Sequence, residues 1–117
     1  MSKHTKTLVG SVDCVVVFVT CPSVSVATRL AKTLVSRRLI ACANIVPSVT
    51  SFFWWDGKVD RAREVLLFLK TTRAVEARLR RAVRSLHPYD VPEVIALPIV
   101  AGHPPYLRWV RSSVPSR

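Results

Sequence analysis

The sequence predicts one α+β domain whose elements follow the order strand, helix, strand, strand, helix, strand. Four apolar runs rich in β-branched and aromatic residues have the composition of strands. They occupy residues 13–21, 41–55, 64–71 and 93–100. Two segments with apolar residues at helical spacing separate the first run from the second and the third from the fourth. Between the second and third runs lie Asp56-Gly57, the strongest short signal for a β-hairpin, and a brief return through Val59.

The first two runs differ in pattern. Residues 13–21, DCVVVFVTC, are almost all apolar, which predicts a strand buried on both faces. Pro47 interrupts the second run, and because proline lacks a backbone N–H, we expect a bulge, a kink or an edge position there. The fourth run, which begins beside Pro92, is expected to be a buried strand.

The two helical segments carry most of the positive charge of a chain whose formal net charge is +11. The first follows Pro22, which suits the first turn of a helix, and it has one apolar face. That face consists of Val26, Ala27, Leu30, Ala31, Leu34 and Val35. The apolar face of the second consists of Val75, Leu79, Ala82, Val83 and Leu86. Residues 29–38 hold four basic residues and no acid, and residues 70–84 hold six against one.

Right-handed crossovers would place both helices on one face of a four-stranded antiparallel sheet, with the first and third strands at its centre. This is the ferredoxin-like arrangement, and it brings the basic residues of both helices onto one outer surface. Nucleic acid, an anionic lipid surface or an acidic protein could bind such a surface. A solvated helix face is the simpler interpretation, because no aromatic residues are interleaved with the charges.

We place this single domain at residues 13–117. A tail precedes it, and it ends in a C-terminal extension. Residues 1–12 are polar, lack an apolar signal-peptide region and predict a flexible N-terminal tail. Residues 106–110, after Pro104-Pro105, predict a C-terminal extension that is either a short helix or an extra strand. No apolar run approaches the roughly 20 residues that span a bilayer. Three cysteines without C-x-x-C spacing argue against disulfides, so we expect a soluble, intracellular and cytoplasmic protein, with an organelle left open.

The connection after the second helix is the most informative stretch of the chain. Its polar side chains belong to His87, Tyr89, Asp90 and Glu93. Pro88 and Pro92 stiffen it by fixing φ and by excluding α-helical geometry at the preceding residues. A rigid polar turn can hold a ligand or a partner, but it can equally be a connector whose polar groups bind backbone.

Several motifs in this order resemble the CutA family, the divalent-cation tolerance proteins, over about residues 15–109. They are ACANIVPSVTSFFWWDGKV, EVLLFLKT, LHPYDVPEVIALPIVAG and PYLRW. The resemblance implies a ferredoxin-like protomer in a compact homotrimer related in shape to the PII signalling proteins. It also implies a role in tolerance of copper and other divalent metals, without an established catalytic activity. The chain departs from the family where acidic residues are common, at Ser23, Ser25, Arg37 and Arg38, and in having His103 where Asn or Asp is common.

The resemblance places His87 and Glu93 beside an intersubunit cleft, and Cys21 could approach them from the end of the first strand. These three residues are the predicted ligands of a divalent metal such as Cu²⁺, although no cofactor is required. Lys70, Tyr89 and Asp90, with Thr71 nearby, form a second predicted cleft for a small anion or regulatory ligand. His4 in the tail could bind metal adventitiously.

Association with further copies follows from the aromatic residues. The hairpin strands are longer than so small a protomer needs, and adjacent Trp54 and Trp55 face opposite sides of a strand. Tyr106, Leu107 and Trp109 could pair with a neighbour's strand edge. The predicted trimer interface consists of Phe53, Trp54, Trp55, Tyr106 and Trp109, with Phe52 beside them. The number three comes from the family resemblance alone.

The functional hypothesis is therefore a non-catalytic homotrimer in divalent metal tolerance that binds a metal or small ligand weakly. Neither a catalytic triad nor a Gly-rich phosphate loop is apparent, and the acylphosphatase arginine loop is missing after the first strand. The alternative is a basic adaptor for an acidic protein partner, which stays unidentified, or for nucleic acid. Nucleic acid is disfavoured because RNA binding on this fold needs exposed aromatics, whereas Phe18 and Phe68 are predicted to be buried.

Overall fold

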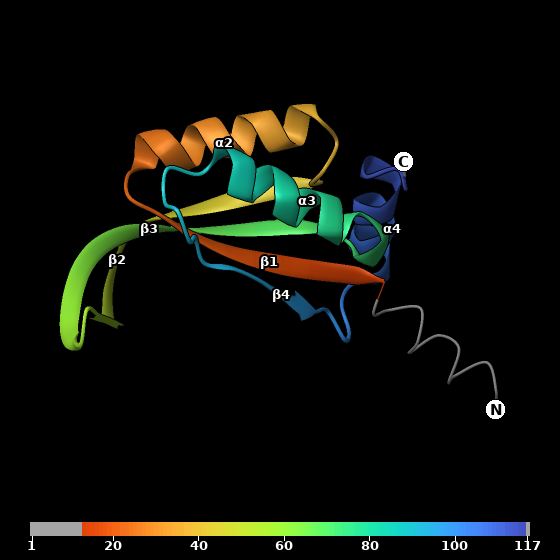
Figure 1. The fold of residues 1–117 in the computed structure, drawn as a ribbon. Helices are drawn as coiled ribbons and strands as arrows, with labels where there is room; N and C mark the ends of the chain where they lie inside the picture. Colours follow the sequence, from red (N-terminus) through yellow and green to blue (C-terminus); the bar gives the residue numbers. More distant parts are fainter. Residues whose placement is uncertain (1–12, 117) are drawn as a thin grey trace.

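The computed structural model describes residues 13–116, so the predicted tail at residues 1–12, with His4, lies outside the described residues. The described chain has four strands and three helices (Figure 1). The strands are β1 (Cys14–Cys21), β2 (Cys42–Trp55), β3 (Lys58–Thr72) and β4 (Val94–Pro98). The helices are α2 (Val24–Ser36), α3 (Arg73–Leu86) and α4 (Pro104–Ser113). Up to β4, this order confirms the predicted βαββαβ arrangement.

The four strands form one sheet in the order β2-β3-β1-β4, and every neighbouring pair is antiparallel. Val17 of β1 stands opposite Leu69 of β3 and Ala96 of β4, which fixes the register at the centre. Helices α2 and α3 lie side by side over one face of this sheet (Figure 1). The ferredoxin-like arrangement predicted from the crossovers is thus confirmed.

The hydrophobic core lies between that face and the two helices. Alternate residues of β1 point into it, because successive side chains of a strand face opposite sides. The buried core residues of the strands are Val15, Val17, Val19, Cys21, Val65, Leu67 and Leu69. Those of the helices are Ala27, Leu30, Leu34, Leu79 and Val83. Both helices bury residues three and four apart, as predicted, although Val35 at the edge of the first stripe is exposed.

Local signals set the ends of α2. The Ser23 hydroxyl accepts a hydrogen bond from the Val26 N–H at 3.2 Å and caps the helix, so Pro22 precedes the helix instead of lying in its first turn. At the other end, Arg38 has a φ of 59°, and the Leu39 N–H donates to the Leu34 carbonyl at 3.0 Å. This is a Schellman motif with arginine at the usual glycine position. It turns the chain toward β2.

The hairpin follows the sequence prediction. Asp56 and Gly57 have φ values of 52° and 76°, the two positive angles of a type I′ turn. The β2-β3 register shifts between Val46 and Val49, which confirms the irregularity expected at Pro47 on what is an edge strand. Since β1 pairs with β3 only from Val65 onward, residues 49–64 form a two-stranded arm that extends past the sheet (Figure 1). With seven residues on each strand, the arm is about 23 Å long.

One prediction about the last elements is wrong, and the alternative left open for the other is decided. Strand β4 is not buried in the protomer, because it pairs with β1 alone and leaves Ile95 half exposed at 50%. The C-terminal extension is the helix α4 and not an extra strand, since Pro104 and Pro105 occupy its first turn. It packs across one end of the sheet, where Leu107 and Val110 form a second small cluster with Cys14. Within residues 13–116, no helix is long and apolar enough to cross a membrane.

Candidate functional sites on the turn, the groove and the sheet face

His87 at the end of α3 is buried, with 7% of its surface exposed. Its Nδ1 lies 3.1 Å from the Tyr89 backbone N–H, and its Nε2 lies 2.8 Å from the Thr20 carbonyl oxygen. Because the Tyr89 N–H can only donate, Nδ1 accepts, and Nε2 must carry the proton that it donates to Thr20. Both nitrogens are therefore engaged with backbone, and neither is free to bind a metal. His87 is therefore a structural residue that binds backbone groups, which was the alternative interpretation of this connection.

Tyr89 ties the same turn to the base of the hairpin arm. Its hydroxyl donates a hydrogen bond to Glu64 Oε2 at 3.0 Å, and its ring centroid lies 4.7 Å from that of His87. Burial, together with the hydrogen bond to the Glu64 carboxylate, raises the pKa of Tyr89 to about 12. Glu64 itself is buried. Sequence reasoning missed this acid, although a lone glutamate at the start of an apolar run was a usable signal.

Cys21 and Glu93 complete the predicted metal set. Burial, and secondarily the Glu64 carboxylate, raises the pKa of the Cys21 thiol from 9.0 to about 11, so it stays protonated at neutral pH and is a poor metal ligand. Glu93 is exposed. In the part of the chain that the structure describes, no three His, Cys, Asp or Glu side chains gather as metal ligands would. A single protomer therefore does not assemble the predicted metal site.

The predicted ligand cleft is also divided within the protomer. Lys70 donates a hydrogen bond to Asn44 Oδ1 and stands opposite Val16, near the start of β1. Glu64, the partner of Tyr89, adjoins Val65 at the opposite end of that strand. Thr71 is fully buried and donates to the Leu39 carbonyl at 2.7 Å. Of the predicted cleft, only Tyr89 and Asp90 lie together, and Asp90 lines a different depression.

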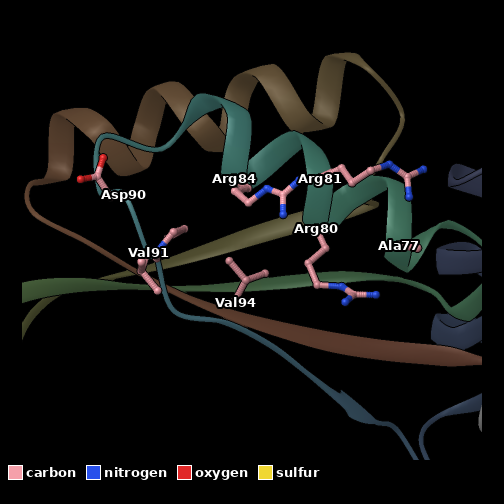
Figure 2. A pocket seen from close by; sticks show the side chains of 8 residues that line it. Ala77, Arg80, Arg81, Arg84, Asp90, Val91 and Val94 are labelled. Carbon is pink, nitrogen blue, oxygen red and sulfur yellow. The ribbon is translucent and has the colours of Figure 1, made fainter.

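That depression is a groove of about 470 Å³ beside α3 (Figure 2). It is lined by Ala77, Arg80, Arg81, Arg84, Asp90, Val91, Pro92 and Val94. Arg80 forms an ion pair with Glu76, with Nε 2.8 Å from Oε2. The sequence predicted a basic helix face here but not the groove, because a helix stripe does not reveal what lies beside it.

Neither α2 nor α3 covers the opposite face of the sheet (Figure 1), and the side chains at the centre of that face are apolar. On it, Phe18 of β1 and Phe68 of β3 stack with centroids 5.0 Å apart, and both are only half-buried. These rings were predicted to be buried, and in the protomer they are only partly so. Ile95 and Leu97 of β4 are exposed beside them. The sequence already indicated a second apolar face, since β1 is apolar at both alternating sets of positions.

The arm and α4 present the aromatic residues of the predicted interface. Trp54 and Trp55 are 75% and 68% exposed, and Phe52 and Phe53 are exposed as well. On α4, the exposed rings of Tyr106 and Trp109 lie 5.5 Å apart. Tyr106 Oη also lies 3.4 Å from Cys42 Sγ.

Two details of the C-terminal prediction need correction. Leu107 is buried against Cys14, so it cannot contact a neighbour. A helix has no free backbone groups along its side, so α4 cannot pair with a strand edge. His103 is the N-cap residue of α4, its carbonyl accepts from the Leu107 N–H at 3.1 Å, and its side chain makes no capping bond.

The fold and these surfaces define a class: a small ferredoxin-like protomer with one helix-covered face, one uncovered apolar face and a projecting aromatic hairpin. The CutA1 divalent ion tolerance protein family model matches residues 15–113, and the chain belongs to this family. This confirms the resemblance found in the sequence.

Several relatives show the extent of the similarity. The chain is 49% identical over 98 residues to the divalent-cation tolerance protein CutA of Thermus thermophilus, covering 84% of this chain and 95% of that one. It is 50% identical over 93 residues to protein CutA of Mus musculus, covering 80% of this chain but 52% of the relative. The chain thus spans about half the length of this mammalian relative. The crystal structure of CutA1 from Oryza sativa superposes with a TM-score of 0.86 at 45% identity, covering 90% of this chain and 96% of that one.

Proposed function

We propose that this chain acts as a non-catalytic homotrimer in tolerance of divalent metal ions, and that it binds such ions weakly at surfaces formed by assembly. The observation that carries the proposal is the uncovered apolar sheet face around Phe18 and Phe68. A face of this kind on a small protein indicates association with another chain. The function in metal tolerance rests on the names of relatives, such as the divalent-cation tolerance protein of Thermus thermophilus.

The projecting arm supports a closed assembly. A two-stranded ribbon is only marginally stable in water, so the arm needs a neighbour to pack against. Its exposed tryptophans, Trp54 and Trp55, supply the large contact surfaces that are typical of interfaces. Among residues 13–116, no further strand pairs with the sheet edges β2 and β4. A cyclic assembly could cover arm, edges and sheet face together, whereas an open chain of contacts would leave some exposed.

The metal proposal rests on exposed carboxylates and not on the buried turn. Glu93 is the one predicted ligand whose side chain is exposed, because His87 and Cys21 are committed to the interior. A lone carboxylate binds a divalent ion weakly, so useful affinity needs ligands from a second protomer. Copper is the first ion to test.

Two measurements test the proposal. Sedimentation equilibrium at micromolar concentration should give a trimer, and Trp55→Asp should dissociate it; a wild-type monomer would contradict the assembly. Calorimetric titration with Cu²⁺ should show weaker binding in Glu93→Gln than in the wild type. The matched variant His4→Ala reports adventitious binding by the tail, and loss of all copper binding in that variant alone would contradict the proposed site.

A further inference from the structure

We propose that the groove beside α3 binds an acidic peptide segment of a protein partner, with an aliphatic side chain of that segment as an anchor. This inference does not depend on metal binding. Helix α3, which forms one wall of the groove, lies on the helix-covered side of the sheet, opposite the face proposed for trimer formation (Figure 1). Contact through that face leaves the α3 wall of the groove exposed, whereas Val94 on the other wall belongs to the β4 edge.

The wall formed by α3 carries arginine side chains that can bind carboxylates. Ala77, Arg80, Arg81 and Arg84 recur at helical spacing, so they form one stripe along the helix. Arg80 is already paired with Glu76. Within residues 13–116, neither Arg81 nor Arg84 has a carboxylate within ion-pair distance. Two free guanidinium groups one turn apart can each hold a carboxylate through two parallel hydrogen bonds.

Apart from Asp90, the opposite wall is apolar. Val91 is 90% exposed on the turn stiffened by Pro88 and Pro92, and Val94 lies beside it (Figure 2). The small side chain of Ala77 leaves room between the walls. A rigid, exposed valine facing a row of arginines fits a segment that presents one aliphatic side chain among acidic ones. A volume of about 470 Å³ is enough for a few side chains.

The same lining argues against nucleic acid. It contains no aromatic ring on which a base could stack. Asp90 lines the groove and repels phosphates and carboxylates alike, so a bound acidic segment must direct its carboxylates toward Arg81 and Arg84 and can donate a backbone N–H to Asp90. The charge and shape of the groove therefore favour a peptide with separated carboxylates.

The test uses the full chain and a fluorescein-labelled twelve-residue peptide that repeats Asp-Ser-Leu, in which the carboxylates are separated. Fluorescence anisotropy near physiological salt should detect binding, and the Asn-Ser-Leu peptide of equal length should not bind. Arg81→Glu combined with Arg84→Glu should weaken binding by about tenfold or more, since two charge-assisted contacts are lost. Val91→Ser should weaken it a few-fold without any change of charge.

The matched control is Arg29→Glu combined with Arg37→Glu, which makes the same change of charge at exposed positions on and just after α2. Because salt screens charges beyond about 8 Å, this variant should change the affinity by less than about twofold. Four results would overturn the proposal: no binding of the acidic peptide, equal binding of the neutral peptide, equal weakening in both double variants, or tighter groove-dependent binding of an oligonucleotide of matching charge.

Discussion

The two faces of the sheet are made from the same strands but have different surroundings. In β1, Val17 and Val19 point toward α2 and α3 and are fully buried. Val16 and Phe18, which alternate with them, are only half-buried on the face that α2 and α3 do not cover. Both sets are equally apolar, so the difference arises only from what covers them. The helices complete one half of the core, and the proposed association would complete the other.

The largest effect is expected on the uncovered face. Phe68→Asp places a charge in the centre of the proposed contact surface, and it should dissociate the proposed trimer because burying an unpaired charge is strongly unfavourable. Sedimentation equilibrium measures the change. Val24→Asp is the matched control, because Val24 is an exposed apolar residue in the first turn of α2, where an acid is favourable. If both variants dissociate, or neither does, the distinction between the faces fails.

On the covered face, packing within the protomer should dominate. Leu79 is fully buried between α3 and the sheet, so Leu79→Ala should lower the free energy of unfolding by about 2–5 kcal/mol. Urea denaturation at fixed protein concentration measures this loss. Leu79→Met, which keeps the volume, should cost less than about 1.5 kcal/mol. Similar values for the two variants would mean that α3 is not tightly packed on the sheet.

Substitution of His87 distinguishes a structural role of this residue from a metal-binding role. His87→Ala removes both of its hydrogen bonds, leaves the Tyr89 N–H without its partner and should reduce stability by about 1–3 kcal/mol. Copper affinity of the folded variant should stay unchanged, as calorimetric titration can show. Weaker copper binding without a loss of stability would restore the metal assignment that the sequence suggested.

Alkaline pH tests the buried thiol on the covered face. The folded-state pKa of Cys21 is raised from 9.0 to about 11. The unfolded chain therefore loses this proton first, and stability should fall as pH rises from about 9 through 11. Urea midpoints across this range should decline less steeply in Cys21→Ala than in the wild type. The difference in thiolate absorbance between the two proteins should titrate near pH 11, and a midpoint near pH 9 would contradict burial of the thiol.

The smallest effect is expected at the tip of the arm. Gly57 has a φ of 76°, and a Cβ there would meet no neighbouring atom. Gly57→Ala should therefore cost only the backbone strain of a left-handed alanine, about 1 kcal/mol. Thermal unfolding measures it, with Gly57→Asn, which tolerates this conformation better, as the comparison. A much larger loss would show that the tip is packed against a neighbour.

Most of the fold was predictable because its signals are local. Asp56-Gly57 specifies its own turn, and Pro47 disrupts pairing wherever it lies in a strand. The stripes at Leu30 and Leu79 need only helical spacing to be recognised. The extension after Pro104 was ambiguous because its short apolar pattern suits a helix and a strand alike, and the two prolines resolve it as the first turn of α4.

The candidate sites were less predictable because they depend on contacts between distant segments. His87 has the side chain of a metal ligand, but Thr20, from the end of β1, occupies one of its nitrogens. Lys70 and Tyr89 looked like partners in the sequence, yet the sheet register separates them along β1. The groove exists only because the turn after α3 passes beside the arginine stripe.

The sequence by itself determined the order of elements, the hairpin, the helix stripes and the family, because each depends on residues close together in the chain. Tertiary structure alone decided which apolar surfaces are covered. Phe18 and Val17 are neighbours of similar hydrophobicity, and only the packing of two helices on one side makes Val17 core and leaves Phe18 at a surface. The physical reason is that burial depends on contacts between elements. A hydrophobic pattern shows which residues can be buried, but not which of them another element covers.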